Sequence, residues 1–191
     1  MRKIKLAKYK FNALHLSSQI FIQFKTENKM ENQKQIIVKS VLDAWNSRIK
    51  EANGILDNLT DEQLQKEIAP DKNRGTYLLG HLTAVNDKML PLLDFEQQQY
   101  SNLNDTFLTK PDKAVSEIPS ASNLRTYWKN SVSKLNTHFS NLSTDQWFEK
   151  HTSVSSEDFG KEPHRNRLNV LLGRTNHLSY HLGQLALLKK Q

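Results

Sequence analysis

The chain has 191 residues, of which 37% are hydrophobic and 25% charged, a composition typical of a globular protein long enough to bury one core. It contains no cysteine, which excludes disulfides, thiolate zinc sites and cysteine nucleophiles and fits the cytoplasm, where we expect the protein. The formal net charge is +7, but no apolar run approaches the ~18 residues that span a bilayer, so we expect no membrane partner.

Most of the positive charge lies in residues 1–29. This segment holds seven Lys and Arg residues against one acid, Glu27, so the chain from Met30 onward carries a net charge of only +1. No stripe of basic and aromatic residues follows, and we therefore expect no nucleic acid partner. The segment also lacks the unbroken apolar stretch of a signal peptide. We interpret it as a leader, either disordered or outside the native protein, and place the domain at residues 30–191.

Four segments carry apolar residues at alternating steps of three and four, which is typical of helices that bury one face. The first two faces consist of Val38, Leu42, Trp45, Ile49, Ala52, Leu56 and Leu59, and of Leu78, Leu82, Val85, Met89 and Leu92. The third, at roughly residues 123–141, offers Leu124, Trp128, Ser131, Leu135, His138 and Leu142, and the fourth Leu171, Thr175, Leu178, Leu182 and Leu185. No strand-like alternation of convincing length occurs, so the sequence predicts an all-α bundle.

A short pattern, N-L-[ST]-x-x-Q-apolar, occurs at residues 58–64 and again at residues 141–147. In each copy the Ser or Thr can cap a helix and the Gln can reach back, as in a capping box. The two copies fit either two related helical hairpins or coincidence, since both are ordinary helix-turn chemistry. Two long connections, residues 101–120 and 149–165, join the predicted helices, and loops of this length are often functional.

His177 and His181 are four residues apart in the fourth predicted helix, so their Cβ atoms should lie about 5–6 Å apart on one face. His81 flanks the apolar face of the second helix as His181 flanks that of the fourth: each lies three residues after a leucine and four before the next apolar residue. Two helices packed through these faces would bring the three imidazoles together. Three neutral imidazoles with open positions suit a catalytic divalent metal, either zinc or nickel.

The alternative is a metal-free core layer of hydrogen-bonded histidines, since a buried histidine is more often a core residue than a ligand. Three glycines near the histidines, Gly80, Gly173 and Gly183, favour a shared centre, because they predict close approach of backbones around it. The remaining candidates for substrate binding are Arg174, Gln184, His138 and His151.

Three motifs together resemble one family: NHLSYHLGQL at residues 176–185, GHL at residues 80–82 and APDK at residues 69–72. Over about residues 31–190 the chain resembles the DinB/YfiT-like four-helix-bundle superfamily. The resemblance implies an up-down-down-up bundle with a long crossover between helices two and three, and frequent dimers, so a homodimer is expected. Residues 73–77 depart from the family pattern by shifting an aromatic residue, which affects the pocket entrance rather than the metal.

The same resemblance implies a nickel or zinc site that maps onto His81, His177 and His181. It also implies transferases that act with low-molecular-weight thiols such as bacillithiol, and mycothiol-dependent isomerases. We therefore expect a metal-dependent enzyme with a small-molecule substrate, in which metal-bound water or an exogenous thiolate is the nucleophile. Arg174 could bind a substrate carboxylate, and Gln184 could bind the ligand or support His181.

Two alternatives remain open from the residues. A metal-dependent hydrolase would need a general base, which Glu157, Asp158 or Glu162 could supply from the second long connection. A non-catalytic module that binds metal or mediates dimerisation would be favoured by a fourth protein ligand, for which His138 and His151 are the candidates.

Overall fold

The computed structural model describes the backbone of residues 2–190 and the side chains of residue 23 and residues 25–189. The chain divides into two compact units, Met1–Ser40 and Val41–Gln191. The described backbone of the first unit is helical and belongs to α1 (Arg2–Asn58), which continues into the second unit. The side chains of residues 1–22 and 24 lie outside the described residues, and the expectation that residues 1–29 form a leader stays a prediction.

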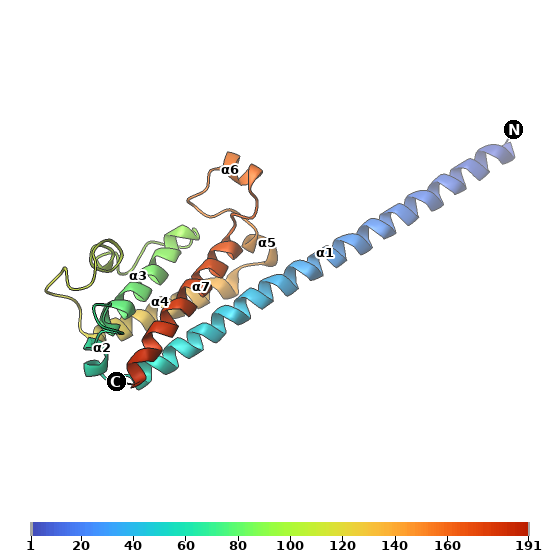
Figure 1. Cartoon of the computed structure of the whole chain (residues 1–191). Helices are drawn as coiled ribbons and strands as arrows, with labels where there is room; N and C mark the ends of the chain where they lie inside the picture. Colours follow the sequence, from blue (N-terminus) through green and yellow to red (C-terminus); the bar gives the residue numbers. More distant parts are fainter. Residues whose placement is uncertain (1, 191) are drawn as a thin grey trace. The chain divides into compact units, whose positions relative to one another are not determined.

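The rest of the second unit is built from helices and their connections (Figure 1). In chain order they are α2 (Asp61–Gln65), α3 (Gly75–Leu92), the π-helix η1 (Asp105–Thr109), α4 (Ala121–Asn141), α5 (Thr144–Trp147), α6 (Ser156–Lys161), α7 (Arg167–Leu185) and the 3-10 helix η2 (Ala186–Lys190). Residues 2–190 contain no β-strand, only two isolated β-bridges. The prediction of an all-α fold is confirmed. None of the described helices is both long and apolar enough to cross a membrane.

Most residues of the predicted apolar faces are buried, and those in the second unit contribute to its core, whereas Leu42, Leu92 and Leu142 are partly exposed. All five residues of the fourth face, which is carried by α7, are buried. On α4 the prediction was wrong at one position, because the inward residue near the end of that helix is Phe139, whereas His138 is partly exposed. Phe139 makes aromatic contacts with Trp45 and Trp147, at ring-centroid distances of 6.1 and 5.2 Å, and this packing selects the larger apolar ring for the core.

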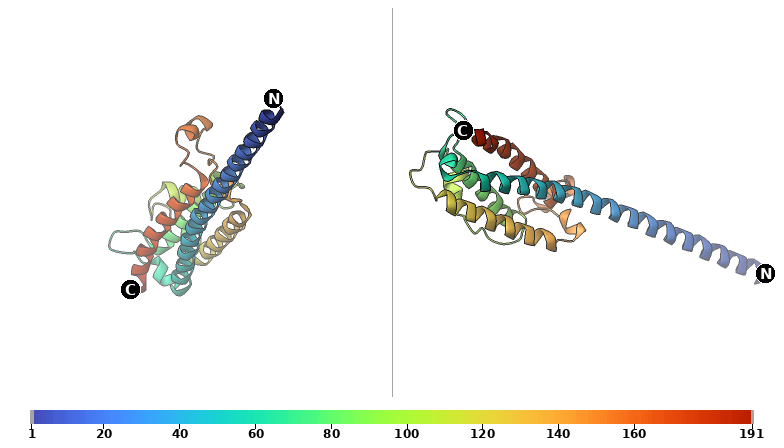
Figure 2. Two further views of the ribbon diagram at one scale, coloured as in Figure 1. Left: turned by 90° about the vertical axis from the view of Figure 1, so that its right-hand side faces the viewer. Right: turned by 90° about the horizontal axis from the view of Figure 1, so that it is seen from below.

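Long helices of the second unit lie side by side (Figure 2). α3 packs against both α4 and α7, and two buried tryptophans join α4 to the part of α1 in this unit. Trp128 on α4 donates its indole N–H to Oδ1 of Asn53 at 2.8 Å, and Trp45 on α1 donates to Oδ1 of Asn136 at 3.4 Å. Each indole thus buries its ring and satisfies its polar group, which fixes the register of the two helices.

Both predicted capping boxes are present. Thr60 caps α2 by accepting from the Gln63 N–H at 3.1 Å, and the Gln63 side chain accepts from the Thr60 N–H at 2.9 Å. Ser143 and Gln146 make the same reciprocal pair at the start of α5. The first box lies between α1 and α3 and the second between α4 and α6, so each closes a turn after a long helix.

Candidate metal centre

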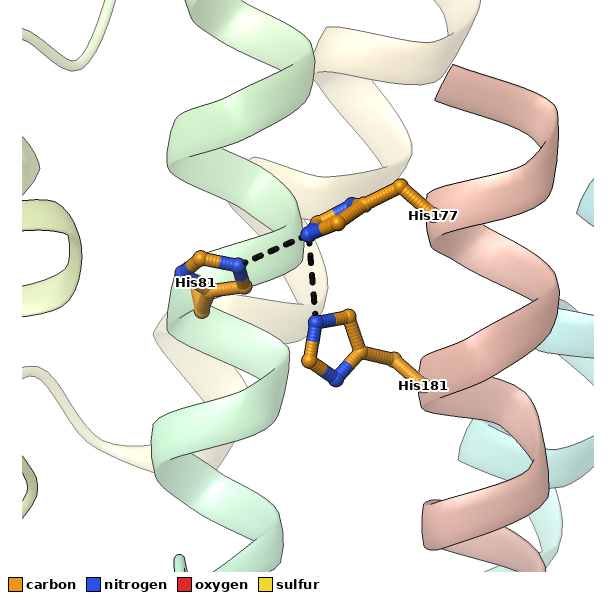
Figure 3. A group of neighbouring side chains, drawn as sticks. All are labelled: His81, His177 and His181. Atoms are coloured by element: carbon orange, nitrogen blue, oxygen red, sulfur yellow. Dashed lines mark hydrogen bonds between the residues drawn. The ribbon is translucent and has the colours of Figure 1, made fainter. Parts of the chain in front are cut away.

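The three predicted histidines meet at one point between α3 and α7 (Figure 3). Nε2 of His177 lies 3.1 Å from Nε2 of His81, which α3 supplies, and 3.1 Å from Nε2 of His181, one turn further along α7. One ligand atom from each ring lies within 4.8 Å of the others. The sequence predicted that these three histidines meet, from their positions beside the apolar faces of two helices, and the structure places them together.

Two of the rings are held by hydrogen bonds through their other nitrogen. His81 donates from Nδ1 to the backbone oxygen of Phe107 at 2.8 Å, and His181 donates from Nδ1 to Oε1 of Gln184 at 2.7 Å. Both partners are oxygens that only accept, so Nδ1 carries the hydrogen in each ring. Nε2 of each is then a bare lone pair that points to the centre, as metal-ligating histidines require.

His177 completes the donor set. Its Nε2 lies between the lone pairs of His81 and His181, so only a hydrogen on His177 can satisfy either contact. Without a metal, three Nε2 atoms therefore lie close together with only the hydrogen of His177 between them. A cation at that point would be held by lone pairs from all three rings if the His177 hydrogen were on Nδ1. This all-nitrogen set fits a divalent metal ion.

Burial keeps the histidines of α7 in the neutral form that metal binding needs. It is the largest cause that lowers the pKa of His177 to about 4, and the charges of His181, His81 and Arg174 act in the same direction. Burial also lowers the pKa of His181, against the opposing effect of its hydrogen bond to Gln184. Protons therefore do not compete for these two ligands at neutral pH.

Gly80 allows the close approach that anchors His81. A Cβ atom at Gly80 would lie 2.3–2.5 Å from ring atoms of Phe107, so no larger residue fits unless Phe107, which η1 carries, moves. The prediction about glycines holds here, but it was wrong for Gly173 and Gly183. Both are exposed and have no atom within 4 Å of an added Cβ, because they lie on the outer side of α7.

A second set of contacts ties the segment after η1 to the start of α3. Asp112 accepts from Nη2 and from the backbone N–H of Arg74, both at 2.7 Å, and Tyr77 donates its hydroxyl hydrogen to the Lys110 backbone oxygen at 2.7 Å. Burial acts to raise the pKa of Asp112, but the bonds from Arg74 outweigh it and the pKa is lowered. The Tyr77 ring also stacks on His81, with the ring centroids 6.4 Å apart. Tyr77 is the aromatic residue of the segment 73–77, where the chain departs from the family pattern, and it lies beside the site.

These contacts are what the sequence reasoning missed. The acceptor for His81 is a backbone oxygen, which has no side-chain signature, and Asp112 lies far from the histidine motifs in the chain. One sequence feature did point to them: Gly80 lies inside a helix, where glycine is unfavourable, and this indicates a close neighbour at that position.

The other four candidates fall into two groups. Gln184 supports His181, and Arg174 lies one turn before His177, half-buried and close enough to affect its pKa. His138 and His151 are not part of the cluster. His138 bonds to Glu96 at 2.9 Å and stacks on Phe95, whereas His151 accepts from the Ser153 N–H at 3.3 Å.

A sequence model of the DinB superfamily matches residues 44–185. That range contains the three histidines and most of the second unit. The chain belongs to the DinB superfamily. No curated protein matches it. For this DinB-superfamily chain, the family and the three-histidine cluster together indicate a divalent metal site.

Proposed function

We propose that this protein is a metal-dependent transferase that uses a low-molecular-weight thiol, with a nickel or zinc ion held by His81, His177 and His181. The observation that carries the proposal is the convergence of three Nε2 atoms, two of them on rings whose Nδ1 hydrogen is already donated. Bound there, the ion would supply a Lewis acid that lowers the pKa of a thiol or a water molecule that it coordinates.

The thiol in this proposal comes from a small molecule, because the 191 residues contain no cysteine. In the transfer, the thiol would pass its proton to solvent, and the sulfur would form a bond to an electrophilic carbon of the second substrate. The leaving group departs with the electron pair of the bond that breaks. The chain contributes by holding His81 through the Phe107 oxygen and His181 through Gln184, and by packing the Tyr77 ring against His81 and Phe107.

A hydrolase has less support, because it needs a general base near the centre. α7 contains no acidic residue, and the one acid of α3, Asp87, is fully buried and accepts from the backbone N–H groups of Gln99 and Tyr100. The acids expected to supply the base are engaged locally in or beside α6, where Glu157 pairs with Lys161 and Glu162 with Arg165. Asp158 likewise bonds to the Ser155 side chain.

A non-catalytic metal module would be favoured by a fourth protein ligand. Since His138 and His151 bond elsewhere, the described residues offer the ion three ligands. Three protein ligands leave positions for a substrate, as in catalytic rather than structural sites.

We also infer an up-down-down-up order for α1, α3, α4 and α7, and a homodimer as the assembly. The order is supported by the long connection between α3 and α4, residues 93–120, which is enough chain to return along the bundle and start α4 in the direction of α3. The dimer is supported by family resemblance alone, and sedimentation of the purified protein tests it.

Elemental mass spectrometry of untagged protein tests the metal site. We expect about one nickel or zinc ion per chain in the wild type and its loss in His177→Ala. His138→Ala is the matched control, because it removes a partly exposed histidine outside the cluster and should keep the ion. If the wild type takes up no metal after reconstitution, the proposal is wrong.

A second experiment tests the reaction. Metal-loaded protein is incubated with a panel of small thiols and an alkylating substrate, and consumption of thiol is followed with time. We expect acceleration by the wild type and by His138→Ala but not by His177→Ala. Release of a hydrolysis product without loss of thiol would favour the hydrolase instead.

A further inference from the structure

Arg174 lies on the same face of α7 as the two histidine ligands of that helix. It precedes His177 by three residues and His181 by seven, and residues at these spacings are neighbours along one side of a helix. Its guanidinium is close enough to His177 to contribute to the lowering of the pKa of that ring. It therefore stands one helical turn from the cluster, on the side toward the start of α7.

No acidic residue with a described side chain forms an ion pair with this guanidinium. Every other arginine with a described side chain forms an ion pair with a carboxylate: Arg48, Arg74, Arg125, Arg165 and Arg167. Arg174 is half-buried, and burial is the sole cause that lowers its pKa, with no carboxylate to oppose it. A half-buried cation without a partner is costly to maintain, which favours a role for it.

The acids on the elements around the site are already bonded, since Asp105 of η1 pairs with Lys110 and Asp112 pairs with Arg74. α7 contains no acidic residue, and both carboxylate oxygens of Asp87, the one acid of α3, are bonded to backbone N–H groups. The three ligands are neutral imidazoles, so a divalent ion among them would keep its charge of +2. The metal and the guanidinium would then be two positive groups about one helical turn apart on α7, and a ligand that contacts both should be negatively charged.

We propose that Arg174 binds a carboxylate of a small thiol whose sulfur reaches the three-histidine centre. This inference rests on the proposed transferase function, and it names the class of thiol. A planar guanidinium can hold a carboxylate through two parallel hydrogen bonds, a geometry that a neutral amide does not match. Because one helical turn is about 5.4 Å, the thiol and the carboxylate should be separated by roughly two or three carbon atoms.

The test uses two probes of the same shape, 3-mercaptopropionate and its neutral amide, with propionate as a probe that lacks the thiol. Dissociation constants are measured by calorimetry on nickel-loaded protein, without turnover. We expect the wild type to bind the carboxylate thiol at least about tenfold more tightly than the amide, as charge-assisted hydrogen bonds allow. In Arg174→Gln the preference should fall below about twofold, while binding of the amide and the nickel content stay unchanged.

Arg48→Gln is the matched control, because it removes an equal charge from a partly exposed arginine that pairs with Glu51. It should keep the full preference. A preference that survives in Arg174→Gln would overturn the inference, since the carboxylate would then bind elsewhere. If neither thiol binds the wild type, the proposed transferase is wrong, and propionate decides the inference alone: Arg174-dependent binding of propionate supports it, and its absence overturns it.

Discussion

Gln184 fixes the orientation of His181 by accepting a hydrogen bond from its Nδ1 at 2.7 Å, from a position three residues further along α7. The bond determines which nitrogen of His181 faces the centre. We predict that Gln184→Met, which keeps the side-chain size but removes the acceptor, weakens metal binding about 10- to 100-fold, as is typical when such supporting contacts are lost. Gln184→Glu restores an acceptor and should bind metal about as tightly as the wild type. Competition with a chelator of known affinity measures both, and equal affinities for Gln184→Met and the wild type would show that the bond has no such role.

A second prediction concerns Gly80, which lies against the Phe107 ring. We expect Gly80→Ala to lower the free energy of unfolding by about 1–3 kcal/mol, because the new methyl group forces η1 away from α3. It should also weaken metal binding, since the Phe107 oxygen moves with η1. Gly173→Ala is the control, because its Cβ would meet no atom within 4 Å. It should raise the free energy of unfolding by about 0.5–1 kcal/mol, since alanine has a higher helix propensity than glycine. Urea unfolding of both variants is the measurement, and an unchanged stability for Gly80→Ala would contradict the contact.

A third prediction follows from the pKa of His177, lowered to about 4 chiefly by burial. In the unfolded chain a histidine titrates near its ordinary pKa of about 6.5. Between these values the unfolded state binds a proton that the folded state does not, so the stability of metal-free protein should fall as the pH drops from about 6.5 toward 4. Above about pH 6.5 the His177 ring is neutral in both states, so it causes no loss of stability there.

Denaturant unfolding of chelator-treated protein at pH 7.5, 5.5 and 4.5 checks this dependence. His177→Asn removes the titrating ring and should lose less stability over the same range than the wild type. His164→Asn, at an exposed histidine outside the cluster, serves as the control and should behave like the wild type. Identical slopes for His177→Asn and the wild type would mean that His177 titrates normally in the folded protein.

A fourth prediction compares two aspartates near η1. Asp112 is almost completely buried and bonds to both the side chain and the backbone of Arg74, whereas Asp105 pairs with Lys110 at the exposed end of η1. We expect Asp112→Asn to reduce the free energy of unfolding by about 1–3 kcal/mol, because hydrogen bonds to a charged group are weakened inside the protein. Asp105→Asn should cost less than about 1 kcal/mol, as exposed ion pairs do. Thermal unfolding separates the two, and equal effects would contradict the proposed tie between η1 and α3.

Local patterns were enough to predict the four helices that pack in the second unit, both capping boxes and the meeting of the histidines, but not η1 or α6, which lie in the two long connections. The flanking positions of His81 and His181 depend only on helical periodicity, and packing of two apolar faces does the rest. Periodicity could not choose between His138 and Phe139 on α4, because adjacent residues differ by only 100° around a helix and the choice depends on Trp45 and Trp147. It could not place the Phe107 oxygen either, since a backbone acceptor in a long connection leaves no trace in the side-chain sequence.

His81 and His177 are 96 residues apart in the chain, and an ion held by both would act as a removable cross-link between α3 and α7. A covalent link that closes a loop of about 100 residues stabilises a protein by on the order of 4–5 kcal/mol, because it restricts the unfolded chain. A metal tie of this span would similarly couple the opening of the two helices. Amide hydrogen exchange in α3 and α7 should then slow together when the ion binds and quicken together when a chelator removes it, so the fold itself would report whether the centre is filled.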